Sequence, residues 1–249
     1  SLSRFLSDAG YREKEITSSG LAIKKEGGGY YDRFRSRIMF PIFDINEQAV
    51  GFTGRIFGEQ QGDAGKYVNT PQTLIYDKSR LIYGLNKAKL AIRKENRCIA
   101  VEGNMDVILS HQAGVQNAVA SSGTALTIQH LKTIKRYTEN LDLCFDADSA
   151  GETATRRAVD WALNEELNVG IIKISSPNLK DPADFIKAYG SKWQEESKNS
   201  KPIVEFYFNK SLRDFDSTAP LGKKQISNLL LPLIKSISNK IERAHWLSE

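Results

Sequence analysis

The sequence contains little that would indicate a secreted, sulfur-ligated zinc or membrane-spanning protein. Only two of its 249 residues are cysteines, Cys98 and Cys144, and neither has a second cysteine or a histidine at zinc-ligand spacing. Both lie in apolar segments, so we expect small buried side chains in a reducing cytoplasm. No apolar stretch approaches the roughly 20 residues needed to span a bilayer, and no signal-peptide pattern opens the chain. These absences predict no zinc in these 249 residues and a protein outside the membrane.

Repeats and low-complexity segments are also absent, whereas charge is unevenly distributed. The whole excess of +5 lies in residues 1–95, and residues 96–249 are balanced. A basic first part beside a neutral second part indicates a surface for a polyanion. The length allows more than one core. Because the chain starts at Ser1 and stops at Glu249 within a helical pattern, we expect it to be the core of something longer.

Strand and helix patterns alternate along residues 97–176. Each apolar run is followed by about 10–17 amphipathic residues, which is typical of a parallel sheet covered by helices on both faces. The predicted strands are CIAVEG, NAVASSG, LDLCFDAD and GIIKIS, and the helix after the second one has Thr127 as its cap. A further helix starts near Asp181, with Pro182 in its first position.

The flanking segments have different patterns. Before residue 95, a short helix and a glycine break precede an antiparallel β-meander with its turn at Asp44–Gln48. The polar stretch 191–202 predicts a linker or a helix boundary, and residues 203–248 predict helices broken or kinked near Pro232. The predicted domains are therefore 1–95, a basic α+β subdomain; 96–190, an α/β domain; and 191–249, a helical subdomain.

Four carboxylates follow two of the predicted parallel strands. Asp146 and Asp148 end one strand and, being two residues apart, project to the same side. Glu102 ends another strand, and Asp106 lies four residues later. Ligands of such sheets bind at the carboxyl ends of the strands, where gathered carboxylates repel one another unless a divalent cation neutralises them. Each motif alone also fits a solvated turn or a helix cap, but the pair predicts a magnesium or manganese site for phosphate chemistry.

These acidic motifs resemble the TOPRIM domain, whose signature is Glu-Gly at a strand end and a later Asp-x-Asp-x-x-Gly. The resemblance covers roughly residues 97–190. It implies a TOPRIM-type parallel sheet flanked by helices and a metal held by Glu102, Asp146 and Asp148. TOPRIM domains occur in bacterial primases, topoisomerases, OLD-type nucleases and RecR-type repair proteins, so this resemblance leaves the reaction open.

The preceding segment is similar to the core of bacterial replicative primases of the DnaG type. The strings that carry the resemblance are YDRFRSRIMFPIFD, GFTGRIF and KYVNTPQTLIYDKSRLIYGL. The matching positions are Arg33, Arg35, Arg37, Pro41, Gly54, Arg55, Lys66, Tyr67, Asn69, Pro71, Lys78, Leu81 and Gly84. With the helical tail, the resemblance spans nearly the whole chain.

The DnaG resemblance implies roles for both charged groups. Glu102, Asp106, Asp146 and Asp148 would be catalytic, with Asp181 joining the metal ligands, although on the sequence alone an aspartate before proline is more often a helix cap. Basic residues would hold nucleotide triphosphate or template–primer phosphates across a cleft from the metal. That set is Arg55, Lys66 and Lys78, with Asn69 beside them and Arg33, Arg35 and Arg37 extending the basic track.

Two features depart from the family pattern. The family often has Asp-Pro-Asp after the fourth strand, whereas this chain has Asp181-Pro182-Ala183-Asp184. The second carboxylate is thus missing at Ala183, and the sequence leaves open whether Asp184 replaces it. The family's N-terminal zinc ribbon and C-terminal helicase-binding domain are also absent from these 249 residues.

The implied function is synthesis of short RNA primers on single-stranded DNA during chromosome replication. The implied partners are the template, ribonucleoside triphosphates and a replicative helicase, the last through the missing C-terminal domain. We expect a monomeric core in the bacterial cytoplasm, associated with the replisome. Two alternatives remain: DNA cleavage, as in a TOPRIM nuclease or topoisomerase, and a RecR-like DNA-binding protein without catalysis. None of the nine tyrosines is marked as a topoisomerase nucleophile.

Overall fold

The structure, a computed structural model, describes residues 1–58, 65–123, 125–145, 149–176 and 178–249. It divides into two compact units, Ser1–Leu81 and Ile82–Glu249. Among the described residues, no helix is both long enough and apolar enough to cross a membrane. The predicted domain boundaries at residues 95 and 190 stay predictions.

The first unit contains the predicted antiparallel meander. The Asp44 carboxylate accepts hydrogen bonds from the backbone N–H groups of Asn46 and Gln48, both at 2.9 Å, and so closes the predicted turn. The confirmed meander is the sheet β3-β4-β5, and a separate hairpin pairs β1 with β2. The elements are α1 (Leu2–Asp8), α2 (Glu13–Ser18), β1 (Ala22–Lys24), β2 (Tyr30–Asp32), β3 (Arg37–Phe43), β4 (Ala49–Ile56) and β5 (Tyr67–Asn69).

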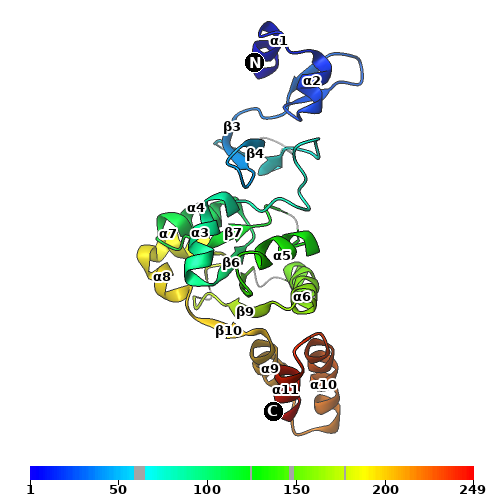
Figure 1. The fold of residues 1–249 in the computed structure, drawn as a ribbon, viewed down its shortest axis with the longest axis vertical. Coiled ribbons are helices and arrows are strands. Elements are labelled where there is room, and N and C mark those ends of the chain that lie inside the picture. Colours follow the sequence, from blue (N-terminus) through cyan, green and yellow to red (C-terminus); the bar gives the residue numbers. More distant parts are fainter. Residues whose placement is uncertain (59–64, 124, 146–148, 177) are drawn as a thin grey trace. The chain divides into compact units, whose positions relative to one another are not determined.

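A five-stranded sheet in the order β10-β9-β8-β6-β7 forms the centre of the second unit (Figure 1). The strands β6, β7, β8 and β9 are parallel, as the near-continuous apolar runs predict. The fifth strand pairs antiparallel with β9 at the sheet edge. The strands are β6 (Cys98–Val101), β7 (Ala118–Ala120), β8 (Asn140–Cys144), β9 (Asn168–Ile172) and β10 (Ser200–Pro202).

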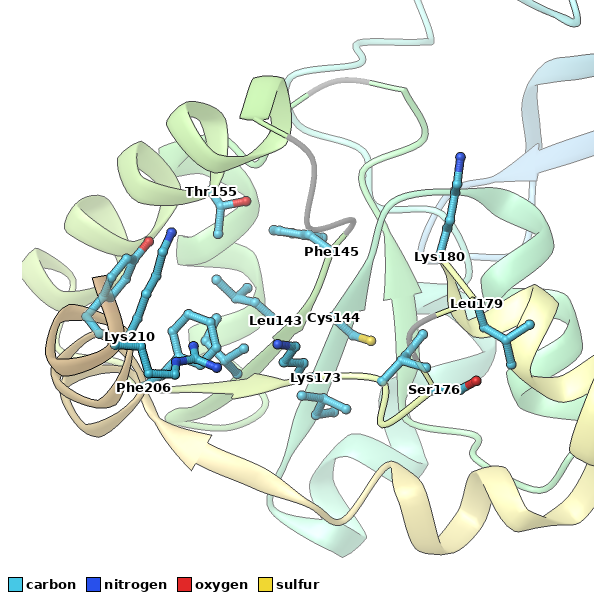
Figure 2. A pocket seen from close by; sticks show the side chains of 15 residues that line it. Leu143, Cys144, Phe145, Thr155, Lys173, Ser176, Leu179, Lys180, Phe206 and Lys210 are labelled. Atoms are coloured by element: carbon cyan, nitrogen blue, oxygen red, sulfur yellow. The ribbon is translucent and has the colours of Figure 1, made fainter. Parts of the chain in front are cut away.

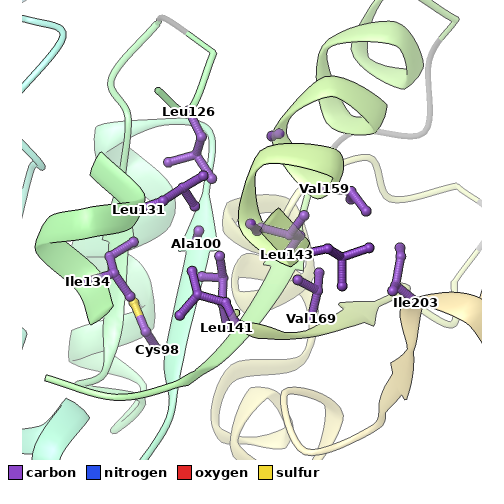
Figure 3. Close-up of a cluster of buried hydrophobic side chains, with 14 of the residues drawn as sticks. Cys98, Ala100, Leu126, Leu131, Ile134, Leu141, Leu143, Val159, Val169 and Ile203 are labelled. Carbon is purple, nitrogen blue, oxygen red and sulfur yellow. The ribbon is translucent and has the colours of Figure 1, made fainter. Parts of the chain in front are cut away.

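Alternation of side chains explains why every residue of β6 is buried. Cys98 and Ala100 face a core formed with α5 (Ile128–Lys135), α6 (Ser149–Asn164), α9 (Ile203–Asp214) and α10 (Pro220–Lys235) (Figure 3). Ile99 and Val101 face the opposite core, formed with α4 (Asn104–Gln112), α7 (Pro182–Tyr189) and α8 (Trp193–Glu196). Both cysteines are free and buried, as predicted. Burial, and to a smaller extent the Asp142 charge, raises the pKa of the Cys98 thiol.

The helices of the second unit cover both faces of its sheet. Thr127 caps α5 as predicted, because its hydroxyl accepts the His130 backbone N–H at 3.1 Å. The helices before the tail are α3 (Leu85–Glu95), α4 (Asn104–Gln112), α5 (Ile128–Lys135), α6 (Ser149–Asn164), α7 (Pro182–Tyr189), the short 3₁₀ helix η1 (Gly190–Lys192) and α8 (Trp193–Glu196). The tail forms α9 (Ile203–Asp214), α10 (Pro220–Lys235) and α11 (Lys240–Ser248).

Two sequence predictions outside the core pattern hold only in part. The polar stretch 191–202 is not a linker, because it includes α8, whose Trp193 is fully buried, and β10 of the central sheet, but the alternative prediction of a helix boundary is confirmed, since α9 begins directly after Pro202. The tail is helical as predicted, and its break lies at residues 236–239 rather than at Pro232, because α10 continues through this proline to Lys235 and α11 begins at Lys240. Tertiary pairing with β9 thus outweighs the weak strand signal of Ser200–Pro202.

Candidate functional site

The carboxyl ends of β6 and β8 lie level with each other. Val101, the last residue of β6, pairs with Cys144, the last residue of β8. Glu102 follows immediately and is exposed to solvent. Asp146 and Asp148 follow Cys144 by two and four residues in the sequence and lie outside the described residues. The predicted acidic group is therefore represented here by Glu102, Asp106 and Asp181.

Asp106 is buried, and its carboxylate joins two parts of the site. Its Oδ2 accepts the backbone N–H of Gly103 at 2.9 Å, and its Oδ1 accepts the backbone N–H of Ala183 at 3.1 Å. The first bond closes the start of α4 and the second reaches the start of α7. The loop that carries Glu102 and the turn that carries Asp181 are thus held by one side chain. Both oxygens of Asp106 are engaged by backbone donors.

Asp181 is the N-cap residue of α7, as the Asp-Pro sequence predicts. Its Oδ1 accepts the backbone N–H of Asp184 at 2.7 Å. Ala183 is buried, so a carboxylate in its place would lie in the packed start of the helix. The Asp184 carboxylate pairs with Lys187 at 3.1 Å on the same helix. The cap hydrogen bond engages one of the two carboxylate oxygens of Asp181.

A polar pair beside Glu102 was not predicted from the sequence. The Ser122 hydroxyl donates to Oδ1 of Asn104, the first residue of α4, and Ser122 has a φ of 57° in the turn after β7. The Nδ2 group of Asn104 is buried and has no hydrogen-bond partner among the described residues. The only signal in the sequence was the pair of serines before Gly123 at the end of a strand.

The described residues do not by themselves complete a metal site. No group of three histidine, cysteine, aspartate or glutamate side chains among them could hold a metal ion. Two of the four predicted metal ligands, Asp146 and Asp148, lie outside this part of the chain. The predicted ligand set therefore stays a prediction.

In the first unit, Arg37 is engaged by its own sheet. Its guanidinium donates to the backbone carbonyls of Gly54 at 3.0 Å, Lys66 at 3.3 Å and Gly65 at 2.9 Å. Gly54 permits this approach, because an added Cβ would lie 2.9 Å from Cδ of Arg37. Arg37 thereby fastens the segment before β5 to β4. This contact would position the neighbouring Lys66, whose side chain is exposed.

The other predicted arginines lie against backbone or aromatic groups of the same unit. Arg33 donates from Nε to the carbonyl of Gly20 at 2.7 Å. The guanidinium of Arg35 lies 5.0 Å from the ring centroid of Tyr31, and that of Arg55 lies 6.0 Å from the centroid of Tyr67. Cation–π contacts of this kind restrain the guanidinium plane while its N–H groups keep donor capacity.

Lys78 and Asn69 lie deeper in the first unit. Burial, and then the positive charge of Arg33, lowers the pKa of Lys78. Oδ1 of Asn69 is buried and has no partner among the described residues, and Asn69 pairs in register with Thr53 across β4 and β5. The structure brings these predicted basic and amide residues into the first unit, on and around its two small sheets.

Two family models match the chain. The model described as DNA primase catalytic core, N-terminal domain, matches residues 1–89, and a Toprim-like model matches residues 99–186. A primase domain from Pseudomonas aeruginosa has 31% identity and a TM-score of 0.84, and the match covers 98% of this chain and 77% of that one. A DnaG primase catalytic domain solved with single-stranded DNA has 33% identity and a TM-score of 0.83, with 99% and 79% covered.

The chain belongs to the DnaG family of DNA primases. Both the DnaG resemblance and the TOPRIM-type α/β fold predicted from the sequence are thereby confirmed. Among curated proteins, the DNA primase of Legionella pneumophila is 36% identical over 229 residues, which is 90% of this chain and 39% of that protein. The chain thus spans about two fifths of the length of its curated DnaG relatives. The cleavage and RecR-like alternatives find no support among these relatives.

Proposed function

We propose that this chain is the catalytic core of a DNA primase, which makes short RNA primers on single-stranded DNA by metal-dependent nucleotidyl transfer. The observation that carries the proposal is Glu102 at the end of β6, level with the end of β8, in a DnaG-family chain whose Asp-x-Asp motif follows β8. The solved DnaG catalytic domain with single-stranded DNA supports this template class. We assign this chain to the bacterial cytoplasm, at sites of chromosome replication.

The chemistry of the acidic residues fits a hard divalent cation. Carboxylate oxygens are the ligands that Mg²⁺ and Mn²⁺ prefer. Glu102, Asp146 and Asp148 would hold the ion, with the free oxygen capacity of Asp181 available beside its cap bond. When bound, such an ion lowers the pKa of an attacking ribose 3′-hydroxyl and offsets charge on the α-phosphate and pyrophosphate.

Asp106 acts as a positioning residue in this proposal. Its two oxygens are bound by the N–H groups of Gly103 and Ala183, so it orients the backbone on either side of Glu102 and Asp181. In this proposal the metal is therefore assigned to Glu102, Asp146, Asp148 and Asp181. The sequence analysis counted Asp106 among the catalytic acids but not among the metal ligands, and this proposal gives it a positioning role instead.

The basic residues of the first unit would bind phosphates. Lys66 is exposed, and the guanidinium groups of Arg35 and Arg55 lie on tyrosine rings. Lysine binds phosphate as a point charge, whereas arginine binds it through a planar fork. We assign Lys66, Arg55 and Lys78, with Asn69, to the nucleotide or the template, and Arg33 and Arg35 to the template strand. Arg37 would contribute through the loop that it holds.

One assay distinguishes this function from its alternatives. The chain is incubated with single-stranded DNA or a primer–template, Mg²⁺ and labelled ribonucleoside triphosphates. A primase core gives template-dependent RNA, a TOPRIM nuclease or topoisomerase gives nicked DNA, and a RecR-like protein gives neither. A product of nicked DNA without RNA would refute the proposal. Extension of the supplied primer should exceed initiation, because the family's zinc ribbon is absent from these residues.

Salt dependence tests the assignment of Lys66. Lys66→Ala should reduce the salt slope of DNA binding by about one if this lysine contacts a template phosphate. Lys14→Ala, which removes an exposed lysine on α2, is the matched control. An unchanged slope with weaker nucleotide binding would move Lys66 from template to triphosphate. If neither the salt slope nor nucleotide binding changed, Lys66 would not belong to the phosphate-binding residues.

A further inference from the structure

A cavity of about 440 Å³ opens in the second unit, at the carboxyl ends of β8 and β9 and beside α6 and α9 (Figure 2). Its volume falls in the range of small-molecule sites, roughly 300–1,000 Å³. None of Glu102, Asp106 and Asp181 lines it. The described residues of the proposed metal site therefore do not form the walls of this cavity.

The inner wall of this cavity is apolar and partly aromatic. Leu143 and Ile171 contribute from β8 and β9, and Phe206 and Tyr207 contribute from α9. Phe145, which directly follows β8, lies near Thr155 of α6 (Figure 2). Tyr207 is buried and has the Arg156 guanidinium 5.1 Å from its ring centroid, so Phe206 and Phe145 supply the aromatic surface of the cavity. Such a surface favours a flat ring, which can stack or pack edge to face against it.

The rim of the cavity is positively charged. Lys173 and Lys180 follow β9, and Lys210 and Arg213 lie three residues apart on α9, so they share one face of the helix. No aspartate or glutamate occurs among the described residues that line the cavity. Four cations around an apolar wall complement a ligand that carries both a ring and several negative charges.

We propose that this cavity binds a nucleoside phosphate, with the base against Phe206 and the phosphates among Lys173, Lys210 and Arg213. An inorganic anion would leave the aromatic wall of the cavity uncovered, and an aliphatic acid has no ring that could stack on that wall. The site goes beyond the proposed polymerase function, because binding here requires neither catalysis nor the metal. The same chemistry could come from a free nucleotide or from the 5′-phosphorylated end of a strand.

Calorimetry with ADP in EDTA-containing buffer tests the site without the metal centre. We expect saturable binding, together with a shift of the methyl resonances of Ile171, which lines the cavity, and not of Ile92 on α3, which does not line it. Lys173→Glu with Arg213→Glu should weaken ADP binding by about tenfold or more, since two phosphate contacts become repulsive.

The matched control is Lys198→Glu with Arg136→Glu, which changes the net charge equally at exposed positions outside the cavity. ADP binding by this control should stay within about twofold of the parent chain. Absence of binding by ADP and by a 5′-phosphorylated oligonucleotide would overturn the proposal, as would equal losses in the two double variants. The proposal would also be overturned if inorganic phosphate displaced bound ADP as effectively as free ADP does.

The two ligand sources are separated by comparing ADP with the 5′-phosphorylated oligonucleotide. Binding of ADP identifies a free-nucleotide site, and binding of the oligonucleotide alone identifies a strand-end site. The result is independent of the polymerase proposal: Glu102→Gln should keep ADP binding in EDTA, because Glu102 does not line the cavity. Loss of ADP binding in Glu102→Gln would place the ligand elsewhere and overturn the assignment.

Discussion

At the residue scale, the Asp106 carboxylate holds together two segments that are far apart in the sequence. Its partner Ala183 lies 77 residues away, and the hydrogen bond between them is buried. Sequence patterns could mark Asp106 as an acid near a strand end. They could not show that its oxygens are occupied, because that depends on a contact with the start of a distant helix.

Asp106→Ala should destabilise the chain, because it leaves the Gly103 and Ala183 N–H groups without their acceptor. Each orphaned buried amide costs about 1–3 kcal/mol, and urea unfolding measures the loss. Glu102→Gln is the contrasting variant: its exposed side chain should change the free energy of unfolding by less than about 0.5 kcal/mol while RNA synthesis is lost. Equal stability of both variants would contradict the positioning role of Asp106.

His111 makes stability depend on pH. Its Nε2 lies 2.9 Å from the Ala118 carbonyl, and burial lowers its pKa despite that hydrogen bond. The unfolded chain therefore binds the proton more readily, so the free energy of unfolding should fall as the pH drops below about 6.5. His111→Gln should flatten this decline in urea titrations at several pH values, whereas His245→Gln, at an exposed position, should leave it unchanged. A steeper decline in His111→Gln would contradict this sign.

At the scale of elements, β10 is attached to the sheet by a buried polar cluster. Arg97 pairs with the Asp142 carboxylate of β8 and donates to the Ser197 carbonyl, while the Ser200 hydroxyl of β10 donates to Asp142. Gly170 of β9 leaves room for this cluster, since an added Cβ would collide with Asp142 and Ser200. A three-residue strand with a terminal proline has no periodic signature, so its place in the sheet could not be read from residues 191–202.

Arg97→Met should leave the Asp142 charge buried without its cation. Breaking a buried pair in this way costs about 3–5 kcal/mol, measured by urea unfolding. The exposed pair between Lys201 and Glu205 supplies the control, because Lys201→Ala should cost less than about 1 kcal/mol. A loss in Arg97→Met no larger than that of the control would show that the cluster does not anchor β10.

The first sheet provides a second test at this scale. Arg37→Ala removes three hydrogen bonds to the carbonyls of Gly54, Gly65 and Lys66, so we expect a loss of about 1–3 kcal/mol in the unfolding of the first unit. Arg35→Ala removes a cation–π contact and should cost about 1 kcal/mol or less. Hydrogen exchange of the β4 and β5 amides would locate the effect. Unchanged exchange in Arg37→Ala would contradict the fastening role of Arg37.

For the whole molecule, the parallel sheet was predictable because burial on both faces requires apolar runs, and Ile99 and Ala100 illustrate this by entering opposite cores. The antiparallel meander was predictable from Asp44 and its turn. The engagement of Arg37 and Asp106 by backbone groups was not, because a motif specifies a residue type and not its partners. The cavity beside α9 was also not predictable, since it needs strand ends and a helix distant in sequence.

The most direct test of the central claim is primer extension in Mg²⁺ by the parent chain and by Glu102→Gln, Asp146→Asn and Asp148→Asn. We expect template-dependent RNA from the parent and at least about a hundredfold lower rate in each variant, as when charge stabilisation of the transition state is lost. Thermal unfolding in EDTA should show that the variants keep their stability or gain slightly, since removing one carboxylate relieves repulsion. Extension by the variants at the parental rate would contradict the account.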